Sequence, residues 1–310
     1  MSRFLRIAGI GILVLAIGGF VAFRHLTARE PIPAESSYAL DLDEIRRLAA
    51  LPVGEKPVRI NYEKVADASL PKGAVFAGES LAEPHPMVHG AHQVVFGDGS
   101  YGVIDSAFGE AALKEMAPDA SLDAGGFAAV QKALGGAKWI VLTHEHGDHI
   151  GGVAVYREPS ELVGRLLLSQ EQLASEDWLD RVKLSDSLRT RLEAVEYDEY
   201  HPVAPGVVLV KAAGHSPGTQ IIYVSLADGR EFLFLGDVAW HSKMITELWY
   251  RPRLVTQFFL GEDRSAVMDQ IRRLHSLRVS EPAVEQVVSH DAEQNRQLID
   301  SGAIGAHFEL

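Results

Sequence analysis

Four potential metal ligands lie close together in the chain, directly after an apolar segment. The segment 139–142 leads into them, and they are His144, His146, Asp148 and His149. In extended backbone, side chains two positions apart point the same way, so His144 and His146 can face one ion. The glycine after His146 permits a sharp turn, from which Asp148 and His149 can face a second point nearby. This spacing predicts a metal site at the end of a strand.

Three further candidates each follow an apolar segment later in the chain, and they are His215, Asp237 and His290. A lone histidine is more often a satisfied surface or core residue than a ligand. Here, however, the order of strand and then ligand occurs four times. Sites in open α/β folds usually lie at such strand ends, so the repetition favours all three residues as ligands.

The absence of cysteine limits the chemistry of this site. The chain has no cysteine, which excludes a thiolate metal site, a disulfide and a cysteine nucleophile. Imidazole and carboxylate donors suit zinc, and also iron or manganese. We therefore expect a metal held by histidine and aspartate alone.

The motifs of residues 58–300 resemble those of the metallo-β-lactamase superfamily. His-x-His-x-Asp-His is its signature, and Gly-His-Ser-Pro-Gly, Gly-Asp and a late Ser-His follow in the same order. The resemblance implies an α/β fold, a four-layer αβ/βα sandwich with the metals at the edge of its two sheets. It also implies the ligand sets, which are His144, His146 and His215 for one ion, and Asp148, His149 and His290 for the other, with Asp237 bridging.

The expected chemistry of such a site is hydrolysis. We expect two Zn²⁺ per chain, with iron or manganese as alternatives. Two ions about 3.5–4 Å apart can bridge a water and lower its pKa toward ~7. The metal-bridging hydroxide would then attack an acyl carbonyl, and Asp148 would orient it and carry its proton to the leaving group.

The spacing of the ligands along the chain narrows the expected substrate within the range that the superfamily covers. Spacings of 66 residues from His149 to His215, 22 to Asp237 and 53 to His290 resemble those of acyl-homoserine lactonases. We therefore expect a lactone, ester or thioester as the small-molecule substrate. Those lactonases carry a tyrosine just after the bridging aspartate, where this chain has Trp240. The alternatives are a mononuclear-iron persulfide dioxygenase-like oxidoreductase, a phosphodiesterase, or a membrane-tethered binding domain without catalysis.

Several other residues are candidates for the substrate pocket. His89 lies with His85 and His92 in a segment with proline and glycine, which predicts a loop. Aromatic and basic side chains after the bridging aspartate could line an acyl pocket or receive a carboxylate, with core packing or solvation as the alternatives: Trp240, His241, Trp249, Tyr250, Arg251, Arg253, Phe258 and Phe259. The segment 162–198 is either a lid over the site or an outer helical layer.

The charge of the chain argues against a nucleic-acid partner. The formal net charge is −13, and residues 1–30 carry +3, which leaves −16 on the remainder. A nucleic-acid-binding protein normally has a basic surface, so we expect no nucleic acid as partner. The sequence does not define an oligomeric state.

The first residues predict a membrane segment. Residues 7–23 are uncharged and are flanked by arginines. About 17–25 apolar residues form a transmembrane helix, so we expect an apolar N-terminal helix that anchors the chain. A cleaved signal peptide is the alternative, which would make the protein secreted. We divide the chain into an anchor with linker, 1–34, and a catalytic domain, 35–310, placed outside the cytoplasm at the inner membrane (periplasmic).

Periodicity and turn residues predict a mixture of strands and helices along the chain. Apolar runs predict strands at 58–62, 74–77, 93–96, 102–104, 139–142, 207–211, 220–225, 231–235 and 286–289. Helices are expected at 42–50, 125–134, 170–178, 184–192, 264–277 and 292–300. Hairpin signals in both halves, such as Gly97-Asp98-Gly99, exclude a purely parallel sheet and favour two mixed sheets with helices outside.

Overall fold

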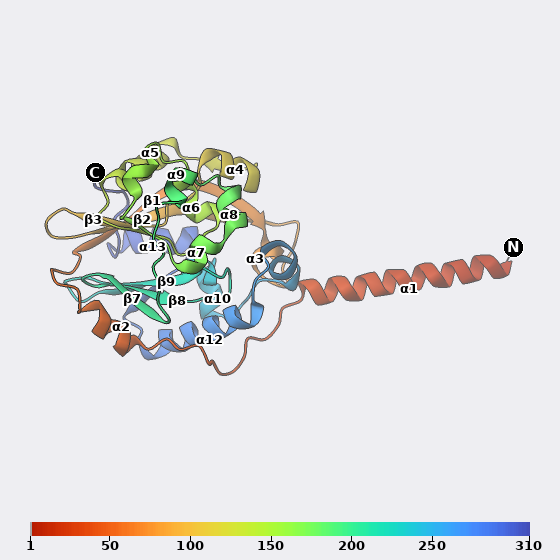
Figure 1. Cartoon of the computed structure of the whole chain (residues 1–310). Helices are drawn as coiled ribbons and strands as arrows, with labels where there is room; N and C mark the ends of the chain where they lie inside the picture. The colour runs from red at the N-terminus through yellow and green to blue at the C-terminus, as the bar shows by residue number, and fades with distance from the viewer. Residues whose placement is uncertain (1) are drawn as a thin grey trace.

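The computed structural model describes residues 2–310, with the side chains of residues 2–10, 12, 14 and 111 outside the description. Helix α1 (Ser2–Thr27) projects from the rest of the molecule (Figure 1). The predicted membrane segment 7–23 falls within this helix, and several of its side chains lie outside the described residues. Among the described residues, no helix is both long enough and apolar enough to cross a membrane.

Two mixed β-sheets form the centre of the molecule. One sheet has the strand order β4-β1-β2-β3-β5-β6 and the other β11-β10-β9-β8-β7. The pairs β3/β5, β5/β6 and β10/β11 are parallel, and the other neighbours are antiparallel. The strands are β1 Arg59–Pro71, β2 Pro84–Val95, β3 Tyr101–Ile104, β4 Ser121–Leu122, β5 Ile140–Val141, β6 Leu166–Leu167, β7 Tyr200–Ala204, β8 Val207–Lys211, β9 Gln220–Ser225, β10 Glu231–Phe234 and β11 Val284–Val287.

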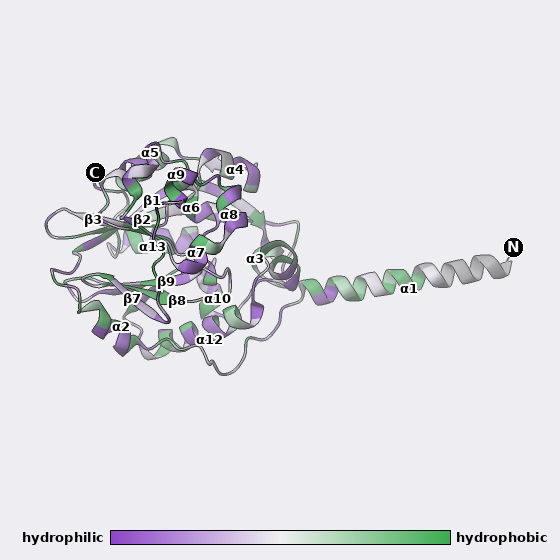
Figure 2. Cartoon of the chain, viewed as in Figure 1, coloured by the Kyte–Doolittle hydropathy of each residue, from purple (hydrophilic) through white to green (hydrophobic). Residues whose placement is uncertain are grey.

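Helices cover the outer faces of both sheets. In Figure 1, α4, α5, α6, α8 and α9 lie above the first sheet, and α2 and α12 lie below the second. The outer helices alternate hydrophilic and hydrophobic residues, as expected of helices with one buried face (Figure 2). The remaining elements are α2 Leu42–Ala49, α3 Lys72–Val75, α4 Glu110–Met116, α5 Ala124–Gly136, α6 Gly147–Ala154, η1 Pro159–Leu162, α7 Gln170–Ala174, α8 Glu176–Arg181, α9 Asp186–Arg189, η2 Gly236–Val238, α10 Ser242–Thr246, α11 Arg253–Val255, η3 Thr256–Leu260, α12 Arg264–Ser280 and α13 Ala292–Asp300.

Short polar side chains define where the longer helices begin. Asp123, Asp263 and Asp291 each accept hydrogen bonds from backbone N–H groups in the first turn of α5, α12 and α13. These groups have no partner within the helix, so a capping carboxylate stabilises the start by about 1 kcal/mol. The helix that approaches the predicted site, α6, has no such cap. It begins directly after His146.

The hydrophobic core has three layers. Strand residues such as Ile60, Val94 and Ile222 pack between the two sheets. A second layer, with Ile45 and Ile271, fills the space between the second sheet and the helices α2 and α12. A third cluster packs α5 and α6 on the first sheet. The predicted α/β fold, with two mixed sheets between outer helices, is therefore confirmed.

Two local predictions are wrong. The segment 74–77, predicted as a strand, contains the end of the short helix α3. The segment with His85, His89 and His92, predicted as a loop, is part of β2, which pairs with β1 along its whole length. Gly90 in this strand has no room for a side chain, since a Cβ there would lie 2.4 Å from the carbonyl oxygen of Glu63. Long-range pairing thus outweighs the local turn signals.

Candidate metal centre

The ends of four strands deliver the predicted ligands to one edge of the two sheets. His144 follows β5, and His146 is the residue before α6. Asp148 and His149 lie in the first turn of α6, so the chain turns into a helix where the sequence predicts a turn. The other three come from the loops after strands of the second sheet: His215 after β8, Asp237 after β10 and His290 after β11.

Three of the histidines form a compact first cluster. His144, His146 and His215 each offer a ring nitrogen, and these atoms all lie within 4.8 Å of one another. The Nε2 atom of His215 lies 3.0 Å from Nδ1 of His146. All three side chains are buried. Three imidazoles that converge in this way match the histidine triad of many zinc sites.

A second cluster lies beside the first. Asp148, His149, Asp237 and His290 offer ligand atoms that also lie within 4.8 Å of one another. Oδ2 of Asp148 is 3.5 Å from Nε2 of His149 and 3.5 Å from Nε2 of His290. The donor set is again mixed imidazole and carboxylate, so both clusters suit the same class of metal.

The carboxylate of Asp237 lies between the two clusters. Its Oδ1 atom is 3.0 Å from Nε2 of His290 and 3.3 Å from Nε2 of His149. Its Oδ2 atom is 3.4 Å from Nε2 of His215 and 3.8 Å from Nε2 of His144. Each oxygen of one carboxylate therefore faces a different cluster, which is the arrangement that the sequence predicts for a bridging ligand.

Unpartnered buried atoms show that a metal fits this cluster. Among the described residues, Nε2 of His144, Nε2 of His149 and Oδ1 of Asp237 are buried and have no hydrogen-bond partner. Leaving such a polar atom unsatisfied costs about 1–3 kcal/mol. All three atoms point into the cluster, where a bound cation would satisfy them together.

The ionisation states of these groups also favour a cation. Burial, together with neighbouring histidines, lowers the pKa of His146 to about 3 and that of His144 well below its usual value, so both rings are neutral and can donate a lone pair. Burial would raise the pKa of Asp237, but His290, His149 and His144 outweigh it and hold that pKa well below its usual range. The ionised carboxylate is the form that binds a metal.

Carboxylates raise the pKa values of two histidines in the second cluster. Burial alone would lower the pKa of His149, but the carboxylates of Asp105, Asp148 and Asp237 outweigh it and raise that pKa well above its usual value. The pKa of His290 is raised as well: burial opposes the shift, and Asp237 and Asp148 cause it. Metal binding at this cluster must therefore displace protons.

Two carboxylates that the sequence analysis did not predict orient the ligands. Asp105 Oδ2 lies 2.9 Å from Nδ1 of His149, and Glu262 Oε1 lies 2.6 Å from Nδ1 of His215. In both histidines the carboxylate contacts Nδ1, so Nε2 faces the cluster. Such hydrogen-bond partners fix both the tautomer and the orientation of a metal ligand. Asp105 directly follows strand β3. The same order of strand and then polar residue that predicts the ligands therefore also indicates Asp105. Glu262 follows η3 in a loop and carries no such signal.

A buried charge network lies behind His215. Arg251 is fully buried, donates to Glu262 and to the carbonyl oxygen of Asp237, and packs on the ring of Trp240 at 4.5 Å. The hydroxyl of Tyr250 donates to the other oxygen of Glu262 at 2.6 Å. Arg251 is thus neither solvated nor open to a substrate carboxylate, and Tyr250 is occupied by the same network.

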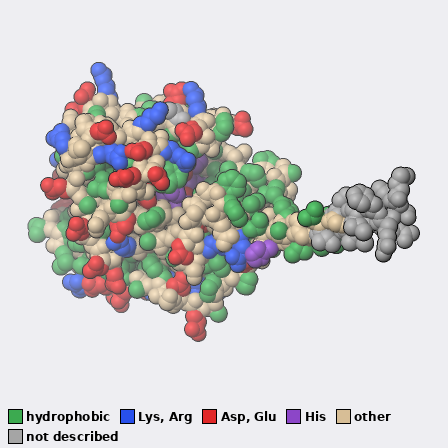
Figure 3. All heavy atoms as spheres, turned by 45° about the vertical axis from the view of Figure 1, so that its right-hand side comes forward, with side chains coloured by type: hydrophobic (Ala, Val, Ile, Leu, Met, Phe, Trp, Pro, Cys, Tyr) green, Lys and Arg blue, Asp and Glu red, His purple; other side chains and the backbone are tan. Residues whose placement is uncertain are grey.

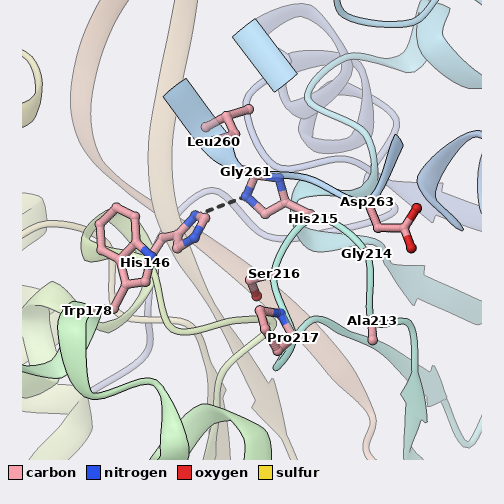
Figure 4. A pocket seen from close by; sticks show the side chains of 10 residues that line it. All are labelled: His146, Trp178, Ala213, Gly214, His215, Ser216, Pro217, Leu260, Gly261 and Asp263. Carbon is pink, nitrogen blue, oxygen red and sulfur yellow. Dashed lines mark hydrogen bonds between the residues drawn. The ribbon is translucent and has the colours of Figure 1, made fainter. Parts of the chain in front are cut away.

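The cavity beside the first cluster has a volume of about 280 Å³ (Figure 4). Its walls include His146 and His215, with Pro217 and Leu260 as apolar parts. Trp178, from the segment 162–198 that was expected to form a lid or an outer helical layer, also lines it, with its ring 4.1 Å from the ring of His146. This residue gives the segment a role at the site as well as in the outer layer.

Three of the candidate substrate residues, His89, Trp240 and His241, occupy different positions. His89 is buried beside the second cluster, with Nδ1 3.5 Å from Oδ2 of Asp148. Trp240 donates from Nε1 to Oδ2 of Asp237 at 2.7 Å, so it supports a predicted ligand. Nδ1 of His241 accepts from the backbone N–H of Lys243 at the start of α10. Nδ1 of His241 also lies 3.1 Å from Oδ2 of Asp291.

Solved structures of similar fold include lactonases and a probable metal-dependent hydrolase. A quorum-quenching N-acyl homoserine lactone lactonase matches with a TM-score of 0.61 and 15% identity, over 79% of this chain and 97% of its own. A probable metal-dependent hydrolase from Staphylococcus aureus matches at 0.58 and 14%, over 77% and 91%. A dizinc quorum-quenching lactonase matches at 0.54 and 15%, over 77% and 91%. At these identities the likeness shows the fold alone. No curated protein matches the sequence.

The family model covers the region that holds the whole centre. The model of the metallo-beta-lactamase superfamily matches residues 88–290, which include all seven predicted ligands. The ligand clusters in this region support binding of divalent metal and hydrolysis of the kind typical of that superfamily. Since the match spans more than half of the chain, the protein belongs to the metallo-β-lactamase superfamily.

Proposed function

We propose that this protein is a hydrolase that binds two divalent metal ions, zinc by ligand type, and cleaves an acyl carbonyl of a lactone, ester or thioester. The observation that carries the proposal is the Asp237 carboxylate, with one oxygen directed at each of two ligand clusters. A site for a single ion would not need the second cluster, so the arrangement favours the two-metal hydrolase over a mononuclear-iron oxidoreductase.

The seven side chains would hold the ions in two sets that share Asp237. When bound, the ions would supply an activated water and polarise the carbonyl of the substrate. Asp148 is the member of the second cluster that is not fully buried, and the surrounding histidines keep it ionised. It is therefore the carboxylate that can orient the attacking water and carry a proton to the leaving group.

The walls of the cavity favour an acyl substrate. Trp178, Pro217 and Leu260 offer apolar surface beside the histidine cluster, where an acyl chain can pack. The structurally similar lactonases act on N-acyl homoserine lactones, which belong to this substrate class. The indole of Trp240 can donate a hydrogen bond but cannot transfer a proton, so it orients Asp237 and takes no part in proton transfer.

Alanine variants of two ligands test the proposal. Asp237→Ala removes the shared carboxylate, and His144→Ala removes one imidazole of the first cluster. We expect both variants to lose bound metal and the hydrolysis of lactone and thioester substrates. Normal metal content together with full activity in either variant would contradict the proposed mechanism.

A further inference from the structure

Polar contacts fix the end of α1 against the catalytic body. The guanidinium of Arg29 lies 4.5 Å from the centre of the Trp249 ring and donates to the carbonyl oxygen of Glu247 at 2.9 Å. Glu30 forms ion pairs with Arg253 and, at 3.1 Å, with Arg264. Arg253 begins α11, and α1 contacts that helix where it leaves the body.

An apolar surface continues from α1 onto the body. Helix α11 leads into η3, where Phe258 is 68% exposed and Phe259 is 73% exposed. Hydrophobic side chains gather where α1 meets the body in Figure 3. The exposed apolar side chains of α1 are Leu13, Leu15, Ile17, Phe20, Val21 and Phe23. Contiguous apolar surface of this kind marks an interaction site, since single exposed residues are common but a cluster is not.

The charge at this surface differs from that of the rest of the chain. Residues beyond 30 carry a net charge of −16, whereas residues 1–30 carry +3. Arg24 and His25 are exposed at the end of α1, next to Phe23. Basic groups beside exposed aromatic and aliphatic side chains suit the interface of an anionic bilayer.

The same surface leads to the cavity. Helix η3 ends at Leu260, and Gly261 follows with φ 68°. Both residues line the cavity beside His146 and His215. Leu260 on the cavity wall is therefore only two positions along the chain from the exposed Phe258. An acyl chain that packs on the phenylalanines would therefore lie close to the wall of this cavity.

We propose that the neck surface, defined as Phe258, Phe259 and the exposed apolar side chains of α1, docks on the interface of an anionic lipid bilayer and receives a lipophilic acyl substrate from it. The docking concerns the bilayer surface and requires no helix to cross it. The delivery of substrate rests on the proposed hydrolase function, whereas the docking does not.

A fluorescent label tests the docking. Because the chain has no cysteine, Phe258→Cys and, as control, Val279→Cys each create a single labelling site. Val279 is 73% exposed at the far end of α12 from the Arg264–Glu30 pair. We expect an environment-sensitive dye at 258 in the full chain to shift to the blue with phosphatidylcholine/phosphatidylglycerol vesicles, and to be quenched by nitroxide lipids. The dye at 279 should not change.

Equal responses at positions 258 and 279 would contradict the docking. A dye at 258 that becomes shielded without vesicles, as the protein concentration rises, would show that a second copy covers the surface and would also overturn the proposal.

Activity tests the delivery of substrate separately. The double variant Phe258→Ser/Phe259→Ser should hydrolyse a long-chain acyl lactone in vesicles several-fold more slowly than the wild type. Its turnover of a short-chain, water-soluble lactone should be unchanged. Val279→Ser serves as the matched control.

Equal turnover of the vesicle substrate by wild type and double variant would contradict the delivery. If the wild type hydrolyses neither lactone, the proposed function fails, and the dye response alone decides the docking.

Discussion

Glu262 lies 2.6 Å from Nδ1 of His215 and is at the same time the ion-pair partner of the fully buried Arg251. Arg251 opposes the effect of burial, which would raise the pKa of Glu262, and with His215 holds that pKa below its usual value. The ionised carboxylate therefore accepts the Nδ1 proton of His215 and leaves Nε2 to face the first cluster. One carboxylate thus links the orientation of a metal ligand to the neutralisation of a buried charge.

Glu262→Gln should weaken metal binding and stability together. The amide preserves the shape but removes the charge that orients His215, and loss of such a partner typically costs 10–100-fold in metal affinity. Arg251 would remain buried without a counter-ion, which lowers the free energy of unfolding by about 3–5 kcal/mol. Competition with a chelator and chemical denaturation measure the two effects.

The matched control is Glu231→Gln, because Glu231 pairs with Arg46 away from the metal centre. It should lower stability less and leave metal affinity unchanged. Equal metal affinity in Glu262→Gln and the wild type would contradict an orienting role of Glu262.

Trp240→Phe should reduce activity through Asp237. The phenyl ring keeps the packing on Arg251 but loses the 2.7 Å hydrogen bond from Nε1 to the carboxylate. We expect a lower kcat with partial loss of metal. Trp249→Phe loses a comparable hydrogen bond, to the carbonyl oxygen of Ala77, and should retain normal kcat and metal content. Identical kcat values for the two variants would argue against a role of Trp240 at the site.

Trp178→Ala should affect substrate binding more than the metal. The indole covers His146 on the cavity wall, and its removal takes apolar contact area from the acyl group. We expect a several-fold rise in KM for long-chain substrates at nearly unchanged metal content. Steady-state kinetics across a series of chain lengths measures this. A KM that does not depend on chain length in either protein would place the acyl chain elsewhere.

Metal affinity should increase with pH. Because the pKa values of His149 and His290 are raised, the metal-free protein keeps protons on these rings to a higher pH than a free imidazole would. An ion must displace these protons, so binding is favoured as pH rises and weakens as pH falls. Calorimetry of zinc binding in buffers of different ionisation enthalpy should detect proton release at pH 7. Binding without proton release would show that these rings are already neutral.

The sequence was sufficient to predict the ligands' common location and the two mixed sheets. The ligands follow apolar segments, and such segments predict strands whose ends meet at one edge, as β5, β8, β10 and β11 do. The predicted strand 207–211 agrees with β8, because a short apolar run rich in β-branched valine favours a strand over a helix.

The sequence was not sufficient where a distant partner determines the structure. Strand β2 includes His85 and His89 because β1 pairs with it, although proline and glycine locally indicate a loop. Glu262 could not be predicted as the partner of His215, since a loop brings it there through its pairing with Arg251. Phe258 and Phe259, which we considered as pocket or core residues, are exposed, because η3 directs them outward beside α1.

The metal content of the full-length chain, purified without chelator, together with its activity on lactone and thioester substrates, tests the central claim most directly. The account predicts two equivalents of metal per chain, loss of hydrolysis when a chelator removes them, and recovery when zinc is restored. One equivalent of iron, with no hydrolysis of either substrate after zinc is added, would contradict it and would favour the oxidoreductase.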